Sequence, residues 1–183
     1  QFHLSVWKAL NASGFLSSAQ ERPIHICEYG CGVAPFSYTL CNITSPNSKL
    51  NISLSDIDGC EHLTFGEWRL QRLKEDKGLD GINIKVEPVR PDELPKYSEK
   101  LDVVLAFEIF EHIPSPLKTL ANFIKQMNPG AILVENFIDH DHDHDDDGDL
   151  GCDLASAAKE RSQYYEVLRF NFELIAGQTP EID

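Results

Sequence analysis

The sequence of 183 residues predicts an α/β protein with a doubly wound, mostly parallel sheet of six or seven strands and helices on both faces. Two observations support this prediction. Apolar runs of strand length alternate with helix-periodic segments from residue 24 to residue 176. One run, within residues 100–110, is continuously apolar, as expected for a central parallel strand buried on both faces. No repeat or linker interrupts the pattern, so residues 1–183 are expected to form a single domain, which could be trimmed at one or both ends.

The individual elements follow from local patterns. Apolar residues at helical spacing, Leu4, Trp7 and Leu10, predict a first helix within residues 3–17, with Gly14 as its stop. Alternating or continuous apolar residues predict strands at 23–28, 49–56, 81–89, 100–110, 128–137 and 170–177. Helix-periodic segments between them predict helices at 35–43, 60–77, 116–128 and 153–169.

Composition restricts the class of partner. The chain has 16 basic and 30 acidic residues, a net charge of −14, which repels phosphate backbones and argues against nucleic acid. No run of about 18 apolar residues exists that could span a membrane. The five cysteines include no C-x-x-C pair, which favours free thiols in a reducing cytoplasm. The sequence does not indicate an oligomeric state.

The stretch ICEYGCGVAPFSYTL carries the strongest functional signal. The first strand ends at the acid Glu28, and Gly30 and Gly32 follow, where the absence of a Cβ lets the chain turn and a ligand lie against the backbone. The next helix begins there, with its free N–H groups facing the ligand. A second acid, Asp56, ends the second strand, where its carboxylate could accept hydrogen bonds from ribose hydroxyls. The pattern indicates a nucleoside-containing cofactor.

The dinucleotide fingerprint G-x-G-x-x-G fails here because Pro35 occupies its third glycine position, which argues against a nicotinamide-dependent reductase. Instead, the E-x-G-x-G-x-A arrangement at 28–34 resembles the first motif of class I S-adenosylmethionine (SAM)-dependent methyltransferases. LSDIDG resembles the second motif, and LDVVLAFEIFEHIPSPLKTLANFIKQMNPGAILVEN resembles the region from the fourth to the fifth strand. The similarity covers about residues 24–136. VRPDELP resembles the third motif, but Arg90 stands where the family often has an acid that contacts adenine.

This resemblance implies a Rossmann-like methyltransferase fold with SAM as the cofactor. It implies that Glu28 and Gly30 hold the methionine end of SAM and that Gly32 lies against it. It places Asp56 at the ribose and Ile57 beside the adenine. Phe107 and Glu108 would line the pocket near the sulfonium.

A second group of functional residues is EIFEH, which puts Glu108, Glu111 and His112 on one face if the turn is helical. The string resembles one in ubiquinone-pathway O-methyltransferases and small-RNA 2′-O-methyltransferases, some of which hold a divalent metal with these residues and a later histidine. That histidine would be His140, or else His142 or His144. The same string occurs in metal-free methyltransferases, where the histidine acts as a base or packs beside the cofactor. His112, with Glu111 beside it, is the candidate catalytic group in either case.

Residues 139–149, DHDHDHDDDGD, allow two further interpretations. The part from Asp143, DHDDDGD, matches the first half of a calcium loop without its bidentate twelfth ligand, and the whole tract suits a solvated loop bordering the active site. We predict an enzyme, a SAM-dependent methyltransferase that acts on a small molecule. The alternatives are a non-catalytic SAM-fold binding module and an RNA 2′-O-methyltransferase.

Overall fold

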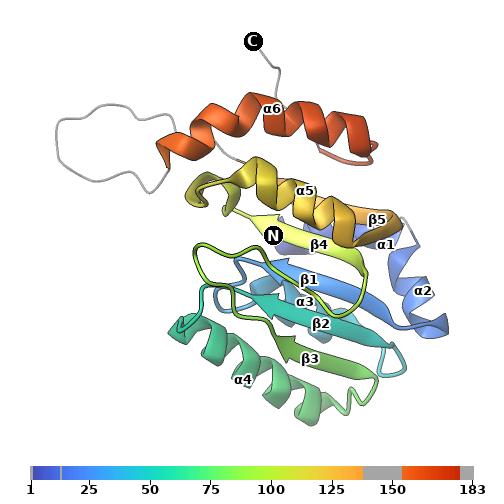
Figure 1. Cartoon of the computed structure of the whole chain (residues 1–183). Helices are drawn as coiled ribbons and strands as arrows, with labels where there is room; N and C mark the ends of the chain where they lie inside the picture. The colour runs from blue at the N-terminus through green and yellow to red at the C-terminus, as the bar shows by residue number, and fades with distance from the viewer. Residues whose placement is uncertain (1, 13, 138–153, 178–183) are drawn as a thin grey trace.

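The computed structural model describes residues 2–12, 14–137 and 154–177, and it contains one parallel sheet (Figure 1). The sheet has the strand order β3-β2-β1-β4-β5, and every neighbouring pair is parallel. Its strands are β1 (Ile24–Tyr29), β2 (Leu50–Ser55), β3 (Ile82–Val86), β4 (Leu101–Phe107) and β5 (Met127–Asn136). The order reverses between β1 and β4, so a crevice at the carboxyl ends of these two strands is the expected ligand site of such a sheet.

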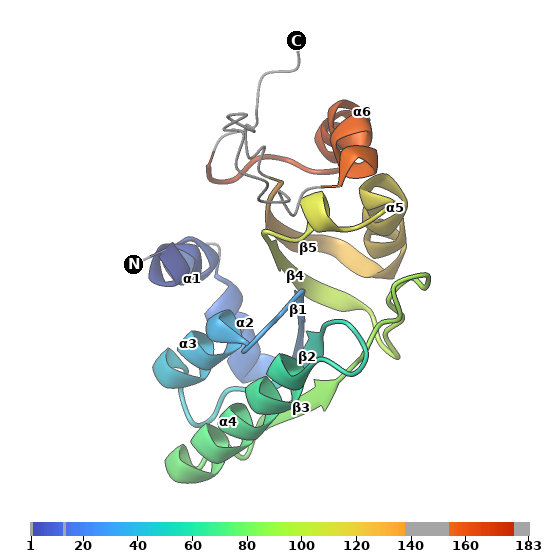
Figure 2. The same cartoon turned by 90° about the vertical axis from the view of Figure 1, so that its left-hand side faces the viewer.

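Helices cover both faces, as the doubly wound fold requires (Figure 2). The helices are α1 (Phe2–Ala12), α2 (Phe15–Glu21), α3 (Pro35–Ile43), α4 (Glu61–Lys77), the 3₁₀ turn η1 (Phe110–His112), α5 (Pro116–Gln126) and α6 (Ala155–Asn171). Helices α1 to α4 lie on one side, and α5 and α6 lie on the other. β4 is buried on both faces because Val103 and Leu105 face the first layer, and Val104 and Ala106 face the second. The predicted fold class is confirmed.

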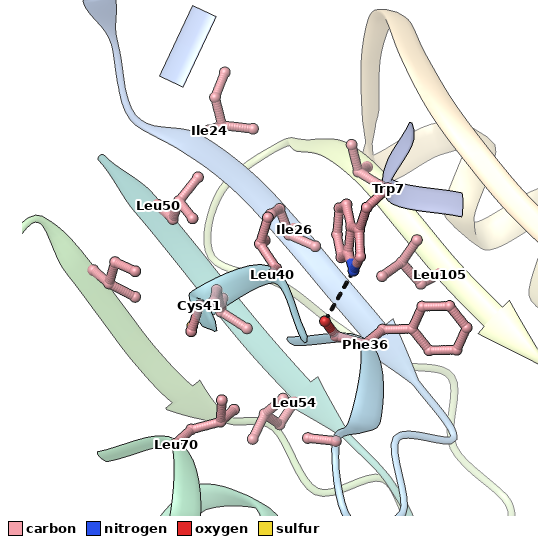
Figure 3. Close-up of a cluster of buried hydrophobic side chains, with 14 of the residues drawn as sticks. Trp7, Ile24, Ile26, Phe36, Leu40, Cys41, Leu50, Leu54, Leu70 and Leu105 are labelled. Carbon is pink, nitrogen blue, oxygen red and sulfur yellow. Dashed lines mark hydrogen bonds between the residues drawn. The ribbon is translucent and has the colours of Figure 1, made fainter. Parts of the chain in front are cut away.

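The core of the first layer holds the N-terminal helix against the helix that follows the glycines (Figure 3). Trp7 of α1 is almost fully buried, and its Nε1 donates a hydrogen bond to the carbonyl oxygen of Phe36 at 3.1 Å. The indole packs among apolar side chains of β1 and β4, including Ile26 and Leu105. The position of α1 is therefore tied directly to the first turn of α3.

The buried carboxylate of Asp102 links the amino ends of the central strands through hydrogen bonds. Asp102 at the start of β4 accepts two hydrogen bonds from the guanidinium of Arg22, at 3.0 and 2.9 Å. The same carboxylate accepts the backbone N–H of His25 and the side-chain amide of Asn128. These hydrogen bonds hold the pKa of Asp102 below its usual value, although burial alone would raise it.

The first helix stops before Gly14 as predicted, since α1 ends at Ala12 and Gly14 takes a φ of 82°; the helix α2 that follows was not predicted. One predicted element is wrong. The sixth strand expected over 170–177 is absent from the described residues. There, α6 continues to Asn171, and Phe170 at its end is 88% exposed. A strand needs a hydrogen-bonded neighbour, and β5 pairs with β4 alone in this part of the chain.

Two further sequence expectations can be compared with the structure. Within the described ranges, no helix is both long enough and apolar enough to cross a bilayer. The four cysteines found there, Cys27, Cys31, Cys41 and Cys60, are free thiols. The acidic tract at 139–149 and the predicted metal ligand His140 lie outside the described residues.

Candidate functional site

The loop between β1 and α3 adopts left-handed backbone angles at its two glycines. Gly30 has a φ of 64° and Gly32 a φ of 48°. A Cβ on Gly30 would lie 2.7 Å from Cγ1 of Ile109, so this side chain, two residues past the end of β4, fills the space beneath the glycine. A Cβ on Gly32 would meet nothing within 4 Å. The loop is thus packed from below at Gly30 and open to a ligand at Gly32.

Glu28, at the end of β1, is buried and turned toward the first turn of α3. Its Oε1 accepts the Phe36 N–H at 3.2 Å, and its Oε2 accepts the N–H and the hydroxyl of Ser37 at 2.8 and 2.5 Å. The carboxylate therefore caps a helix whose preceding residue, Ala34, has no side-chain acceptor. Burial raises the pKa of Glu28 to about 7, although the hydrogen bonds from Ser37 and Phe36 oppose this rise.

Asp56, just after β2, holds the glycine loop from the other side. Its Oδ2 accepts the Gly32 N–H at 2.6 Å, and its Oδ1 accepts the N–H of Ile57 at 2.7 Å. A carboxylate has about four acceptor positions, so each oxygen retains capacity for a further donor. Ile57 beside it is 57% exposed, which leaves an apolar surface at the place expected for an adenine ring.

Two pockets meet at this loop. The first, here called the glycine-loop pocket, has a volume of about 200 Å³ and lies between Gly30, Phe36 and Phe107. The second, the Asp56 pocket, has a volume of about 420 Å³ and is lined by Asp56, Ile57 and the segment after β3. Tyr29 and Gly30 line both pockets, so the two form adjoining parts of one cleft at the carboxyl ends of β1, β2 and β4.

Aromatic rings form one wall of the glycine-loop pocket. Phe36 and Phe107 are stacked, with ring centroids 4.1 Å apart and an interplanar angle of 7°. His3 of α1 lies against the outer face of the same group, 4.2 Å from the Phe36 centroid. Glu108 also lines this pocket, and it has a φ of 50° that is unusual for a residue other than glycine. Its N–H donates to Oδ1 of Asn136 at 2.8 Å.

The E-x-x-E-H string does not form the predicted helical face. It forms a single 3₁₀ turn, so its three polar side chains diverge. Glu111 is 0% exposed and lines neither pocket, whereas His112 lines the Asp56 pocket and Glu108 the glycine-loop pocket. Among the described residues, no three histidine, cysteine or carboxylate side chains are close enough to hold a metal. The metal site expected from Glu108, Glu111 and His112 is therefore not assembled there.

The predicted cofactor residues, by contrast, come together. Glu28, Gly30, Phe107 and Glu108 line the glycine-loop pocket, and Asp56 and Ile57 line the Asp56 pocket. Gly32 lines neither pocket but is held by Asp56 at their edge. The third-motif segment forms the far wall of the Asp56 pocket, with Arg90 and Asp92 both in its lining.

Sequence reasoning missed several residues that shape the cleft. The buried Ser37 donates its hydroxyl to Glu28, and its place in the first turn of the predicted helix was the only signal in the sequence. Arg69 of α4 donates to the carbonyl oxygen of Ala34 at 3.1 Å and lies 4.4 Å from the ring centroid of Tyr38. Ile109, between β4 and η1, supports Gly30, a contact that no local pattern in the sequence indicates.

Known proteins share the fold of this chain, although their sequences differ from it widely. No curated protein sequence matches the chain. A Galdieria sulphuraria protein assigned as a sarcosine dimethylglycine methyltransferase superposes with a TM-score of 0.51 at 16% identity, over 72% of this chain and 45% of that one. CalS10, an amino pentose methyltransferase from Micromonospora echinaspora solved with SAM, gives 0.47 at 14% identity, over 70% and 48%. Coclaurine N-methyltransferase, solved with SAH, gives 0.44 at 15% identity, over 67% and 34%.

At 16% identity the match to the Galdieria protein shows a shared fold alone, and the chain spans less than half the length of each of the three proteins. The sequence model of a family described as "Methyltransferase domain" matches residues 9–175. This range includes the glycine loop, the Asp56 turn and every described strand. The chain therefore belongs to the methyltransferase-domain family.

Proposed function

We propose that the chain binds SAM across the two pockets and transfers its methyl group to a small molecule. The observation that carries this proposal is the junction of the glycine-loop pocket and the Asp56 pocket at Gly30, at the point where the strand order reverses. The smaller pocket suits the methionine end of the cofactor. The larger one, with its exposed Ile57 and its carboxylate, suits the adenosine end.

The residues present fit this cofactor. Glycines without side chains allow the ligand to lie against the backbone, and Gly32 has open space where a Cβ would be. Phe107 is half-buried and lines the glycine-loop pocket, so its ring gives the sulfonium end of the cofactor an aromatic contact. Glu28 and Asp56 position the backbone of the loop, and each carboxylate keeps acceptor capacity for ligand donors.

When bound, SAM supplies an electrophilic methyl group. The chain's own task is to hold the two reactants in line and to exclude water, which can account for about 7 to 11 kcal/mol of a barrier. The aromatic wall of His3, Phe36 and Phe107 excludes water at the methionine end. A small-molecule acceptor agrees better with the net charge of −14 than RNA does.

The test is calorimetric titration of the chain with S-adenosylhomocysteine (SAH), before and after EDTA treatment. We expect micromolar binding in both states and at least a tenfold loss in Asp56→Ala. The matched control is Asp80→Ala, an exposed acid beyond the end of α4, which should bind as the wild type does. Folded wild-type protein that fails to bind SAH would contradict the proposal. SAH binding without methyl transfer across an acceptor screen would instead favour the non-catalytic module.

A further inference from the structure

The outer face of α4 carries two aromatic side chains that the fold leaves exposed. Phe65 is 48% exposed and Trp68 is 62% exposed, although the two rings pack on each other with centroids 5.6 Å apart. Neither residue lines the glycine-loop pocket or the Asp56 pocket. Large aromatic side chains that serve neither the core nor the ligand cleft indicate an interaction surface.

Helix α4 lies at the end of the first layer, beyond α3 (Figure 2). In both views it is at the opposite end of the molecule from α6 (Figure 1). Its inner face is buried, because Leu63 and Leu70 join the core of the first layer. Gly66 on the same face lies against the glycine loop, where a Cβ would meet the carbonyl oxygen of Gly32 at 3.2 Å. The outer face therefore points away from both the core and the cofactor loop.

Four residues form one line along this outer face, here called the α4 stripe: Glu61, Phe65, Trp68 and Arg72. All four are exposed. They are separated by four, three and four positions, so they lie on one side of the helix. The aromatic residues stand in the middle, with an acid at the amino end and a base at the carboxyl end. The spacing is the same in both directions along the helix.

A stripe with this symmetry is complementary to a second copy of itself. We consider two α4 helices that pack antiparallel about a two-fold axis. The register that places Phe65 against Trp68 of the partner subunit also places Glu61 opposite Arg72 of the partner subunit, because both pairs are centred on the same point of the helix. Arg72 pairs with Asp76 at 3.3 Å in the single chain, but both side chains are more than half exposed, so little is lost when this pair is exchanged.

The charge of α4 also favours this contact. The whole chain carries a net charge of −14, so two copies repel each other over most of their surface. Helix α4 is an exception, because its 17 residues include four acidic and four basic side chains. Tyr38 of α3 and Arg69 extend the surface beside the stripe, with the guanidinium 4.4 Å from the ring centroid. Tryptophan, tyrosine and arginine are the residues that most often dominate the binding energy of protein interfaces.

We propose that the chain forms a two-fold symmetric dimer through antiparallel contact of the α4 stripes. Four aromatic rings meet at the centre of this interface, and one ion pair lies at each end. The inner faces of the paired helices point away from the interface, so the two cofactor loops lie on opposite sides of it. The inference does not depend on SAM binding, since the stripe lines neither pocket of the cleft.

The experiment is sedimentation equilibrium over a hundredfold range of protein concentration. We expect a reversible monomer–dimer equilibrium in the wild type and at least tenfold weaker dimerisation in Trp68→Ala. The matched control is Phe170→Ala, which removes an aromatic ring that is 88% exposed on α6 and should leave the equilibrium unchanged. Fluorescence locates the contact. Of the two tryptophans, Trp7 is buried, so a shift of the emission to shorter wavelength on dimerisation reports Trp68.

Charge reversal tests the antiparallel register. Glu61→Arg and Arg72→Glu each place like charges at both ends of the interface and should weaken dimerisation at least fivefold. The double variant restores opposite charges and should recover most of the wild-type affinity. Glu166→Arg, at an exposed position of α6, changes the net charge as Glu61→Arg does and should have no such effect. Urea denaturation checks that each variant is folded.

Three results would overturn the proposal. The first is a wild-type chain that stays monomeric at every concentration. The second is a dimer that Trp68→Ala leaves unchanged or that the double charge reversal does not recover. The third is a monomeric chain that binds phosphatidylcholine vesicles and loses that binding in Trp68→Ala, because a membrane surface would then be the partner of the stripe.

Discussion

Replacing each glycine of the β1–α3 loop by alanine separates the packing role of Gly30 from the ligand role of Gly32. Both residues have left-handed φ angles, so alanine costs about 1 to 2 kcal/mol of backbone strain at either position. At Gly30 the new methyl group would also lie 2.7, 2.8 and 3.0 Å from three atoms of Ile109. Such overpacking adds about 1 to 3 kcal/mol. At Gly32 the methyl group meets nothing.

We therefore expect Gly30→Ala to lower the free energy of unfolding by about 2 to 5 kcal/mol and Gly32→Ala by about 1 to 2 kcal/mol, measured by urea denaturation. For SAH binding we expect the opposite order, with the larger loss of affinity in Gly32→Ala. Gly32→Ala adds a methyl group in the open space beside Asp56, at the edge of the two pockets, and should weaken SAH binding at least tenfold while remaining folded. Equal destabilisation by the two variants, or unchanged SAH affinity in Gly32→Ala, would refute this reasoning.

Three further predictions concern other parts of the molecule. Asp102→Ala should lower the free energy of unfolding by about 2 to 4 kcal/mol in urea denaturation, because Arg22 and the β1 backbone lose a shared acceptor; a loss no larger than that in Arg22→Ala alone would contradict this. Burial raises the pKa of Glu135 to about 7 from 4.5, as it does for Glu28, so the folded state binds the extra protons, and each carboxyl group should lower wild-type stability by about 3 kcal/mol as the pH rises from 4.5 to 7. Glu135→Gln should remove about half of that fall, and a profile identical to that of the wild type would show that this carboxyl group is not a cause. His112→Ala should weaken SAH binding about threefold to tenfold because His112 lines the Asp56 pocket, whereas unchanged binding with lost turnover would support the catalytic role predicted from the sequence.

The sequence predicted the parts of the site that follow from backbone geometry. Glycines after a buried strand and an acid at the end of the next one identify a loop that a nucleoside ligand can approach, and the structure brings them together. The sequence could not predict which groups the acidic side chains of the site contact. Glu28 was expected to hold the ligand; its carboxylate lines the glycine-loop pocket and also caps α3, because Ala34 offers no cap there.

Other differences have tertiary causes. Whether E-x-x-E-H forms a helix or one turn depends on the packing of η1 against α6, which lies far along the chain. Phe36 and Phe107 are 71 positions apart, and only the assembled sheet stacks their rings. The alternation of Phe170, Phe172 and Leu174 was typical of a strand, but no described strand pairs with it; α6 runs on to Asn171, and residues 172–175 form neither helix nor strand.

The position of Phe36 links three parts of the molecule in one residue. Its N–H binds Glu28, its carbonyl oxygen binds Trp7 of α1, and its ring stacks on Phe107. Since His3 of α1 also lines the glycine-loop pocket, a ligand that shifts Phe36 changes the contacts that hold α1 in place. The free energy of ligand binding and the free energy of docking α1 are then coupled, and by thermodynamic linkage the coupling is reciprocal. A substitution that weakens the docking of α1 would lower the affinity for SAH by the same factor by which bound SAH strengthens that docking.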